Sequence, residues 1–233
     1  MLNLEQVKKN SQISEFIKQS QISMDAMDFT EHGTRHANIV AKRSRELAKD
    51  IGLDKRTQEL SAIAGYCQDM GNFIGRTRHH YWGALLFHQV FSSHVVDDQD
   101  KWEKDNLALT PEEISIIVQC LANHDKDTMK LTNPVSAIVV IADKSDVHRS
   151  RVTTKSEQEI AKDIHDRVNY AVTQSDIKVD NNKNIDLRLK IDTSNVPIME
   201  YFEIFTGRMA YCRKAAEYLG YNFRLFINDF KLL

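Results

Sequence analysis

The chain has 233 residues, with 31 Lys and Arg against 33 Asp and Glu and a formal net charge of -2 at pH 7. This near-neutral balance argues against a general electrostatic attraction to nucleic acid or to a membrane surface, so an anionic ligand would need a specific site. A hydrophobic fraction of 42%, with only 8 Gly and 3 Pro, argues against extended disorder and is typical of a mostly helical globular protein.

The cysteine pattern and the lack of long apolar runs narrow the class further. Cys67, Cys120 and Cys212 are far apart and odd in number, which argues against a disulfide framework and against a Cys-rich zinc site. The N-terminal residues lack the apolar core of a signal peptide, and no apolar run reaches the roughly 18 residues of a membrane span. We therefore expect a cytoplasmic protein with buried, reduced thiols and no membrane contact.

Apolar residues at spacings of three and four predict helices in the N-terminal part of the chain. Residues 3–27 would form one long helix or two short ones, with a polar break at 19–21. A second apolar stripe, starting from Thr30, predicts a helix that Gly52 ends. His32 and His36 are four residues apart, so they would share a face if this helix includes both.

The next predicted helix carries the acid that the rest of the candidate site surrounds. Asp54 has the position of an N-cap, and an apolar run through Cys67 continues the helix to near Gly71. Asp69 would fall in its last turn, where a negative charge opposes the helix dipole and needs a positive charge nearby. A metal ion would supply that charge.

Three further helices are predicted before residue 150. The stretch from His79 to about residue 96 is expected to be helical, followed by a polar loop over 97–106, with these side chains facing inward: Leu85, Leu86, Val90 and Phe91. Residues 110–113 (Thr-Pro-Glu-Glu) combine a capping box with Pro at the first helical position, and that helix would run to His124. Asn133 and the proline after it repeat the signal for a helix through Asp143 to Val147.

The character of the chain changes after residue 154. A charged helix over about 155–172 leads into two stretches of alternating apolar residues around an Asn-rich turn at 181–184, which predicts a β-hairpin. Pro197 opens another helix that Gly220 ends, and apolar alternation from Phe223 to Phe230 predicts a final strand. We expect a mainly α fold, with a helical domain over 1–154 and a small C-terminal α+β unit over 155–233.

Several polar residues stand at or near the ends of otherwise apolar helices: His36, Asp69, His79 or His80, His124 and Asp143. Such side chains resist burial unless they are paired or liganded. Imidazole together with carboxylate suits a divalent transition metal such as Mn, Fe, Co, Ni or Zn better than an all-oxygen Mg or Ca site, although Mg stays a candidate. A metal held in this way can activate water and bind phosphate oxygens, as phosphoester hydrolysis requires.

These residues resemble the HD-domain metal-dependent phosphohydrolases. The resemblance covers residues 30–150 and rests on His-Gly-x-x-His, an acid closing an apolar helix, His with Gly four residues on, His, and Ala-Asp-Lys. It implies an HD-like helical bundle and a hydrolase for a phosphorylated small molecule such as a nucleotide or nucleotide signal. It implies that the metal ligands are His36, Asp69, His79, His124 and Asp143, with Gln68 and His80 as further candidates.

One departure from the family pattern lies next to the central acid. Gln68 stands where the family has the His of its His-Asp pair, and Asn72 stands where many members have Lys. An amide oxygen is a poorer metal donor than imidazole, but three remaining ligands are enough for a catalytic metal. The alternative is therefore a degenerate HD domain that binds a nucleotide or a protein partner without turnover.

The remaining predicted roles concern catalysis and phosphate binding. Asp69 would hold the metal, His124 would stabilise developing charge, and Asp146 would orient a ligand or act as a base, with a surface salt bridge as the alternative. Four basic residues near the candidate ligands could bind phosphate oxygens, although solvated surface charge is the simpler expectation for each: Arg76, Arg78, Lys126 and Lys144. The sequence leaves a homodimer open.

Overall fold

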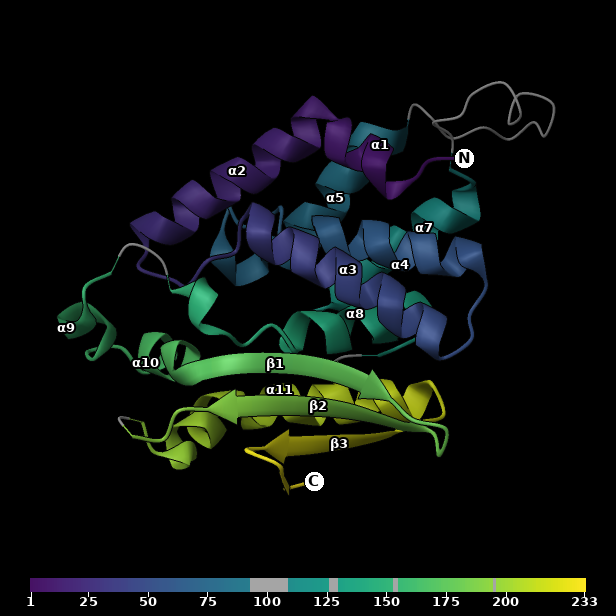
Figure 1. Cartoon of the computed structure of the whole chain (residues 1–233). Coiled ribbons are helices and arrows are strands. Elements are labelled where there is room, and N and C mark those ends of the chain that lie inside the picture. The colour runs from purple at the N-terminus through teal and green to yellow at the C-terminus, as the bar shows by residue number, and fades with distance from the viewer. Residues whose placement is uncertain (93–108, 126–129, 153–154, 195) are drawn as a thin grey trace.

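The computed structural model describes residues 1–92, 109–125, 130–152, 155–194 and 196–233. The fold is mainly α, with a strand unit at the C-terminus, and the strands lie against one side of the helical layer (Figure 1). The helical part contains α1 (Leu4–Lys9), α2 (Ser11–Ala26), α3 (Thr34–Asp50), α4 (Lys55–Cys67), α5 (His79–Phe91), α7 (Pro111–Asn123), α8 (Pro134–Lys144) and the 3-10 turns η1 (Arg76–Arg78) and η3 (Arg149–Arg151).

The C-terminal part begins with two short helices and then forms a small sheet. Its elements are α9 (Glu157–Ile160), α10 (Ile164–Ala171), β1 (Val172–Val179), β2 (Asn184–Ile191), α11 (Ile198–Tyr218), β3 (Asn222–Ile227) and β4 (Phe230–Lys231). The strand order is β1-β2-β3-β4, with β1 antiparallel to β2, β2 parallel to β3, and β3 antiparallel to β4. A parallel pair needs a crossover connection, and α11 provides it along the back of the strands (Figure 1).

Local capping signals fix the starts of three helices, as predicted. Asp54 accepts hydrogen bonds from two backbone N–H groups at the start of α4. Thr110 and Glu113 form the predicted capping box at the start of α7. Asn133 caps α8 by accepting from the Ser136 N–H. The helix ends predicted at Gly52 and Gly220 are confirmed as well, because these residues follow α3 and α11 with positive φ angles of 82° and 77°.

Several predicted boundaries are wrong, each for a local reason. Residues 3–27 form two helices divided at Asn10, which caps α2, and the polar stretch at 19–21 lies inside that helix. The charged helix expected over 155–172 is broken because Asp163 caps a new helix, and β1 follows directly from Val172. Phe230 does not continue β3, because Asn228 and its neighbour adopt positive φ angles and turn the chain back.

The inward face of α5 also differs from the prediction. Leu85 is 61% exposed instead of buried, whereas Leu86 is partly buried against the core and Ala84 and Phe87 are buried. Val90 and Phe91 are buried as expected. The end of this helix beyond residue 92 and the loop expected over 97–106 lie outside the described residues.

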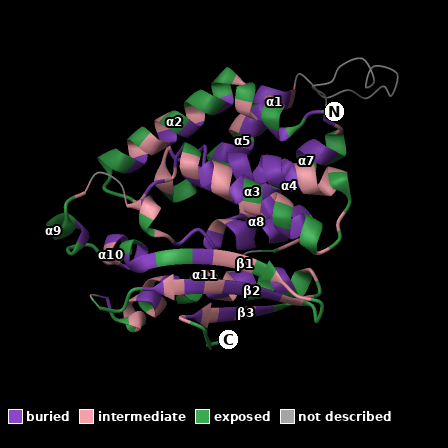
Figure 2. Ribbon diagram, viewed as in Figure 1, coloured by how far each residue is buried: buried purple, intermediate pink, exposed green. Residues whose placement is uncertain are grey.

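Two hydrophobic clusters form the core, and α8 takes part in both. The first joins α1, α2, α4, α5 and α7 with Val135 and Val139, and the second joins Ile138 and Ile141 with the sheet and with α11. Helix α8 is therefore buried along most of its length (Figure 2). The C-terminal unit shares this core with α8, although the boundary at 154 itself stays a prediction. This packing fixes α11 beside the helix that carries Asp143.

No helix in the described parts of the chain combines the length and the apolar character needed to cross a membrane.

Gly71 allows a close approach that positions the site. A Cβ atom at this position would lie 2.1 Å from the His79 carbonyl oxygen and 2.4 Å from the Gly83 nitrogen, and neither backbone atom can move aside cheaply. We expect Gly71→Ala to destabilise the fold by at least about 2 kcal/mol and to lower Tm by roughly 4–8 °C. Gly207→Ala is the matched control, because no atom lies within 4 Å of its Cβ position and Ala favours a helix interior. Thermal unfolding of both variants checks this, and an unchanged Tm for Gly71→Ala would contradict it.

Candidate metal centre

The ends of five helices converge on one small region. His36 comes from the first turn of α3, Asp69 from the turn after α4, His79 from the start of α5, His124 from the end of α7 and Asp143 from the last turn of α8. Their ligand atoms form two groups, in each of which all the atoms lie within 4.8 Å of one another. We call His36, Asp69 and Asp143 the first cluster, and Asp69, His79 and His124 the second cluster.

In the first cluster an imidazole nitrogen faces two carboxylates. His36 Nε2 lies 3.2 Å from Asp69 Oδ2 and 3.2 Å from Asp143 Oδ1. Its other nitrogen, Nδ1, lies 2.7 Å from Asp146 Oδ2. A carboxylate behind a histidine holds the ring orientation and places the proton on the nearer nitrogen, as is common for histidines that bind metals. Asp146 is held in turn by Arg35, whose Nη2 donates to Asp146 Oδ2 at 2.8 Å.

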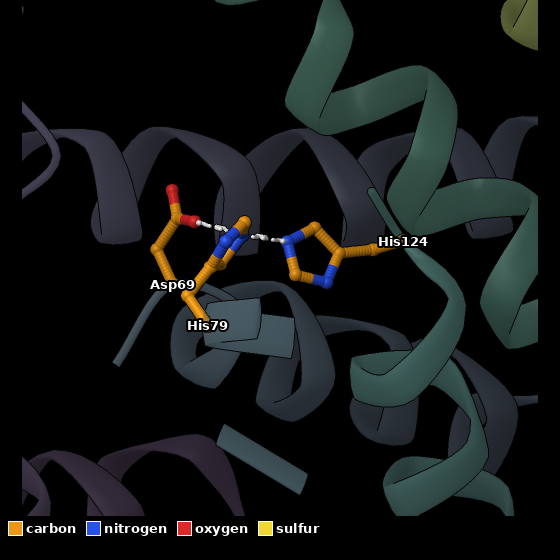
Figure 3. A group of neighbouring side chains, drawn as sticks. All are labelled: Asp69, His79 and His124. Atoms are coloured by element: carbon orange, nitrogen blue, oxygen red, sulfur yellow. Dashed lines mark hydrogen bonds and ion pairs between the residues drawn. The ribbon is translucent and has the colours of Figure 1, made fainter. Parts of the chain in front are cut away.

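In the second cluster two histidines face each other beside the same acid (Figure 3). The Nε2 atoms of His79 and His124 are 3.1 Å apart, and they lie 3.3 Å and 3.7 Å from Asp69 Oδ1. The Nδ1 atoms lie 2.8 Å from the Arg76 carbonyl oxygen and 2.7 Å from the Leu121 carbonyl oxygen. A carbonyl only accepts, so each Nδ1 carries a hydrogen and each neutral ring presents a lone pair at Nε2. Two lone pairs at this separation repel each other unless a cation or a proton lies between them.

Asp69 connects the two clusters, because its Oδ2 faces the first and its Oδ1 faces the second. The prediction that Asp69 lies in the last turn of α4 is wrong, because that helix ends at Cys67 with Gln68 as its C-cap. Asn72 Nδ2 holds the turn by donating to the Asp69 backbone oxygen at 2.8 Å and to Oδ1 at 3.0 Å. Thus Asn72 orients the shared acid.

Gln68 lies within the first cluster. Its Nε2 donates to Asp69 Oδ2 at 3.1 Å and to Asp143 Oδ1 at 3.2 Å, and it lies 2.9 Å from His36 Nε2. Its Oε1 is buried and has no hydrogen-bond partner among the described residues. A half-turn of the amide would bring the oxygen to the cluster, where it suits a cation but not two carboxylates. The orientation of the Gln68 amide therefore depends on whether a metal is bound.

The pKa values of the first cluster reflect its crowded charges. Burial alone would lower the pKa of His36, as would Arg151, but the contacts with Asp143, Asp146 and Asp69 outweigh them and raise it to about 10. Burial alone would raise the pKa of Asp143, whereas Lys144 and His36 hold it well below its usual range. The first cluster therefore attracts positive charge strongly enough to keep a proton on His36.

Charged neighbours also outweigh burial in setting the pKa values of Asp69 and His124. Hydrogen bonds to His124, His36 and His79 oppose the effect of burial and keep the pKa of Asp69 well below its usual range. The pKa of His124 is raised despite burial, because Asp69 lies beside it. A bound divalent ion would take over this charge compensation, so the residues present fit a metal.

The structure places the other predicted residues as follows. Asp146 lies behind His36 and contacts its ring, which is the geometry of an orienting group. His80 is buried next to the second cluster but is outside both groups of ligand atoms. Arg78 is exposed, and among the described residues it has no ion pair with either cluster. Lys126 lies outside the described residues.

Two of the predicted phosphate ligands are already engaged. Lys144 Nζ donates to the His124 carbonyl oxygen at 3.0 Å, to Asp143 Oδ2 at 3.0 Å and to Asp125 Oδ1 at 3.4 Å. Arg76 Nη1 donates to Asn72 Oδ1 at 3.1 Å, and its Nη2 lies 3.8 Å from Asp125 Oδ2. Both side chains are therefore already paired with protein groups at the edge of the site.

Sequence reasoning missed three groups at this site, the first of which is Arg35, the donor to Asp146. Asp125 pairs with Lys144 and Arg76, and its position directly after His124 was the only signal for it. Arg208, in α11, interacts electrostatically with Asp143 and Asp125. Nothing in the sequence around Arg208 indicates this, because the interaction depends on how α11 packs against α8.

Asp146→Asn tests the support behind His36. Burial would raise the pKa of Asp146, but His36 and Arg151 hold it well below its usual range. Its ionised form thus stabilises the fold above the unfolded pKa of about 3.9, and this contribution is lost as the pH falls through the folded-state pKa. We expect Asp146→Asn to cost roughly 3–5 kcal/mol at pH 7, and roughly 1 kcal/mol less at pH 3.

Urea unfolding at both pH values measures this difference. Asp229→Asn is the control, because the Asp229 side chain is 76% exposed and only a small change is expected there. An Asp146→Asn penalty that is the same at pH 3 and pH 7 would contradict the role of the ionised carboxylate.

Comparison with known proteins does not assign the chain to a family. Neither protein-family models nor curated proteins give a match to it. Its function is therefore inferred from the chemistry of the two clusters.

Proposed function

We propose that the protein is a metal-dependent phosphohydrolase of the HD-domain type that acts on a phosphorylated small molecule, such as a nucleotide or a nucleotide signal. One observation carries the proposal. His36, His79 and His124 each have Nδ1 engaged by an oxygen acceptor and Nε2 turned toward the carboxylate of Asp69. Histidines with fixed outer nitrogens around a shared buried acid are typical of sites that hold divalent metals.

The two clusters suggest the residues that would hold one or two ions. His36, Asp69 and Asp143 would hold the first, with the Gln68 oxygen as an additional ligand after the amide turns, and Asp69, His79 and His124 would hold the second. When bound, a divalent ion supplies Lewis acidity toward phosphate oxygens and lowers the pKa of a water. The mixed nitrogen and oxygen donors and the availability of each metal would decide which ion binds: Mn, Fe, Co, Ni, Zn or Mg.

The chain's own residues would orient and protect the reacting groups. Asp146 holds the proton on His36 Nδ1, and Asn72 fixes the orientation of Asp69. The His36 side chain is 1% exposed while that of Asp125 is 40% exposed, so Asp125 lies on the solvent side of the site. With one ion in the first cluster, the His124 ring would stay free of metal and could stabilise negative charge that develops on the phosphate.

The alternative function is a binding domain without turnover, and Gln68 is the observation that favours it. Its amide donates to both Asp69 and Asp143, so it partly takes the place of a cation between these carboxylates. A nucleotide or a protein partner would then be recognised in a regulatory role. Metal content and catalytic rate distinguish the two functions.

Asp69→Ala tests the enzyme. Protein purified without chelator should contain a divalent metal and should hydrolyse a nucleotide, a cyclic nucleotide or a generic phosphoester with added Mn, Co, Ni or Mg. Because Asp69 faces both clusters, Asp69→Ala should reduce kcat/KM at least about 100-fold, or about 2.7 kcal/mol of barrier. Asp50→Ala, at an exposed position in α3, is the matched control.

The results of this assay separate the proposals. Wild-type protein that holds no metal and hydrolyses none of these substrates would exclude the enzyme and leave the binding domain. An unchanged rate for a folded Asp69→Ala variant would mean that hydrolysis occurs elsewhere on the chain.

Gln68→His tests the departure at the first cluster. Imidazole is a better donor than an amide to a transition metal, and it cannot bridge Asp69 and Asp143 as the amide does. We expect Mn or Zn to bind at least about tenfold more tightly, equal to about 1.4 kcal/mol. Isothermal titration calorimetry measures this, with Gln58→His as a control on the same helix. Weaker metal binding by Gln68→His would show that the amide is the better ligand.

A further inference from the structure

An arginine from the C-terminal unit lies at the open side of the metal centre. Arg208 belongs to α11 and is half-buried, with its guanidinium carbon 4.8 Å from the centre of the Phe205 ring. Within the described residues it has no hydrogen bond and no ion pair with a carboxylate at contact distance. A partly buried cation without a hydrogen-bond acceptor is costly, so the position favours an anion from solution.

The packing of α11 directs this residue toward the first cluster. Lys144 Nζ lies 5.9 Å from the centre of the Tyr211 ring, which puts this face of α11 against the end of α8. Arg208 precedes Tyr211 by three residues and therefore lies on the same face of the helix. Its charge interacts with those of Asp143 and Asp125 and with the like charges of Arg151 and Arg76. Arg208 therefore lies close enough to the centre for its charge to interact with those of the acids there.

The other cations at this side cannot take its place. The three hydrogens of the Lys144 ammonium are already directed at His124, Asp143 and Asp125. Arg151 donates to the backbone oxygens of Asp146 and Glu31. By contrast, the guanidinium of Arg208 has a planar fork of donors that none of the described residues engages. Such a fork suits two oxygens of one phosphate group.

We propose that Arg208 binds the phosphate group of the substrate at the open side of the metal centre, so that α11 completes the substrate site. This assignment rests on the proposed phosphohydrolase function. It gives the C-terminal unit a direct part in recognition: the helical part supplies the candidate metal ligands, and α11 supplies a donor for the substrate. Because the residue contacts the phosphate and not a metal ligand, its loss should weaken substrate binding and leave the metal in place.

Binding of inorganic phosphate tests the assignment. Calorimetry on the full chain, with and without added Mn, should give a phosphate Kd that rises about 10- to 100-fold in Arg208→Ala, as expected when a charge-assisted contact is removed. Arg208→Lys keeps the charge but loses the fork, so an intermediate Kd is expected. Arg213→Ala is the matched control, because Arg213 lies on the same helix with a side chain that is 53% exposed, and its Kd should equal that of the wild type.

Metal content and Tm, measured on the same samples, distinguish the possible outcomes. Equal phosphate binding by wild type and a folded Arg208→Ala variant would overturn the assignment, as would a wild type that binds no phosphate in either condition. Protein that holds no metal but loses phosphate binding only in the Arg208 variants would refute the phosphohydrolase and support the anion site. If hydrolysis is found, Arg208→Ala should raise KM more than it lowers kcat.

Discussion

The structure depends on the placement of one buried carboxylate, that of Asp69, whose two oxygen atoms each contact protein groups. Asp69 Oδ2 lies against His36 and Gln68, and Oδ1 lies against His79 and Asn72. A carboxylate at this depth must be surrounded by donors, because an unpaired buried charge costs far more than folding can offset. The helix ends that meet here are therefore arranged around Asp69 and the donors that compensate its charge, and the close contact of Gly71 with the start of α5 makes the meeting possible.

The chemistry of the centre depends on how Gln68 resolves a conflict. The surrounding carboxylates favour a proton on His36, whereas the amide nitrogen at 2.9 Å suits a bare His36 Nε2. A metal ion removes the conflict, because it accepts a lone pair from His36 and an oxygen from a turned amide. Without a metal, the Gln68 amide donates to both carboxylates and reduces the repulsion between Asp69 and Asp143. The same residue thus links the catalytic proposal and the binding alternative.

Much of the fold and part of the site could be predicted from sequence. Caps such as Asp54, Thr110 and Asn133 act on backbone groups two or three residues away, so their effect is local and visible in the sequence. The strand hairpin, the long helix after it and the positive-φ Gly220 follow for the same reason. The order of His and Asp residues at helix ends also predicted the residues that form the two clusters, because acids and imidazoles in apolar surroundings need partners.

Tertiary structure decided what those residues do to one another. Only packing turns Asp146 toward the ring of His36, engages Lys144 with three acceptors and brings Asp125 to the rim. The same holds for α11, which packs on α8 through a core that spans distant parts of the chain and carries Arg208 to the open side of the centre. Sequence by itself determined which groups are available and where helices begin, because those effects act over a few residues. The distances, proton positions and unsatisfied donors of the site arise from contacts across more than a hundred residues of chain, as between His36 and Asp146, and only the folded structure fixes them.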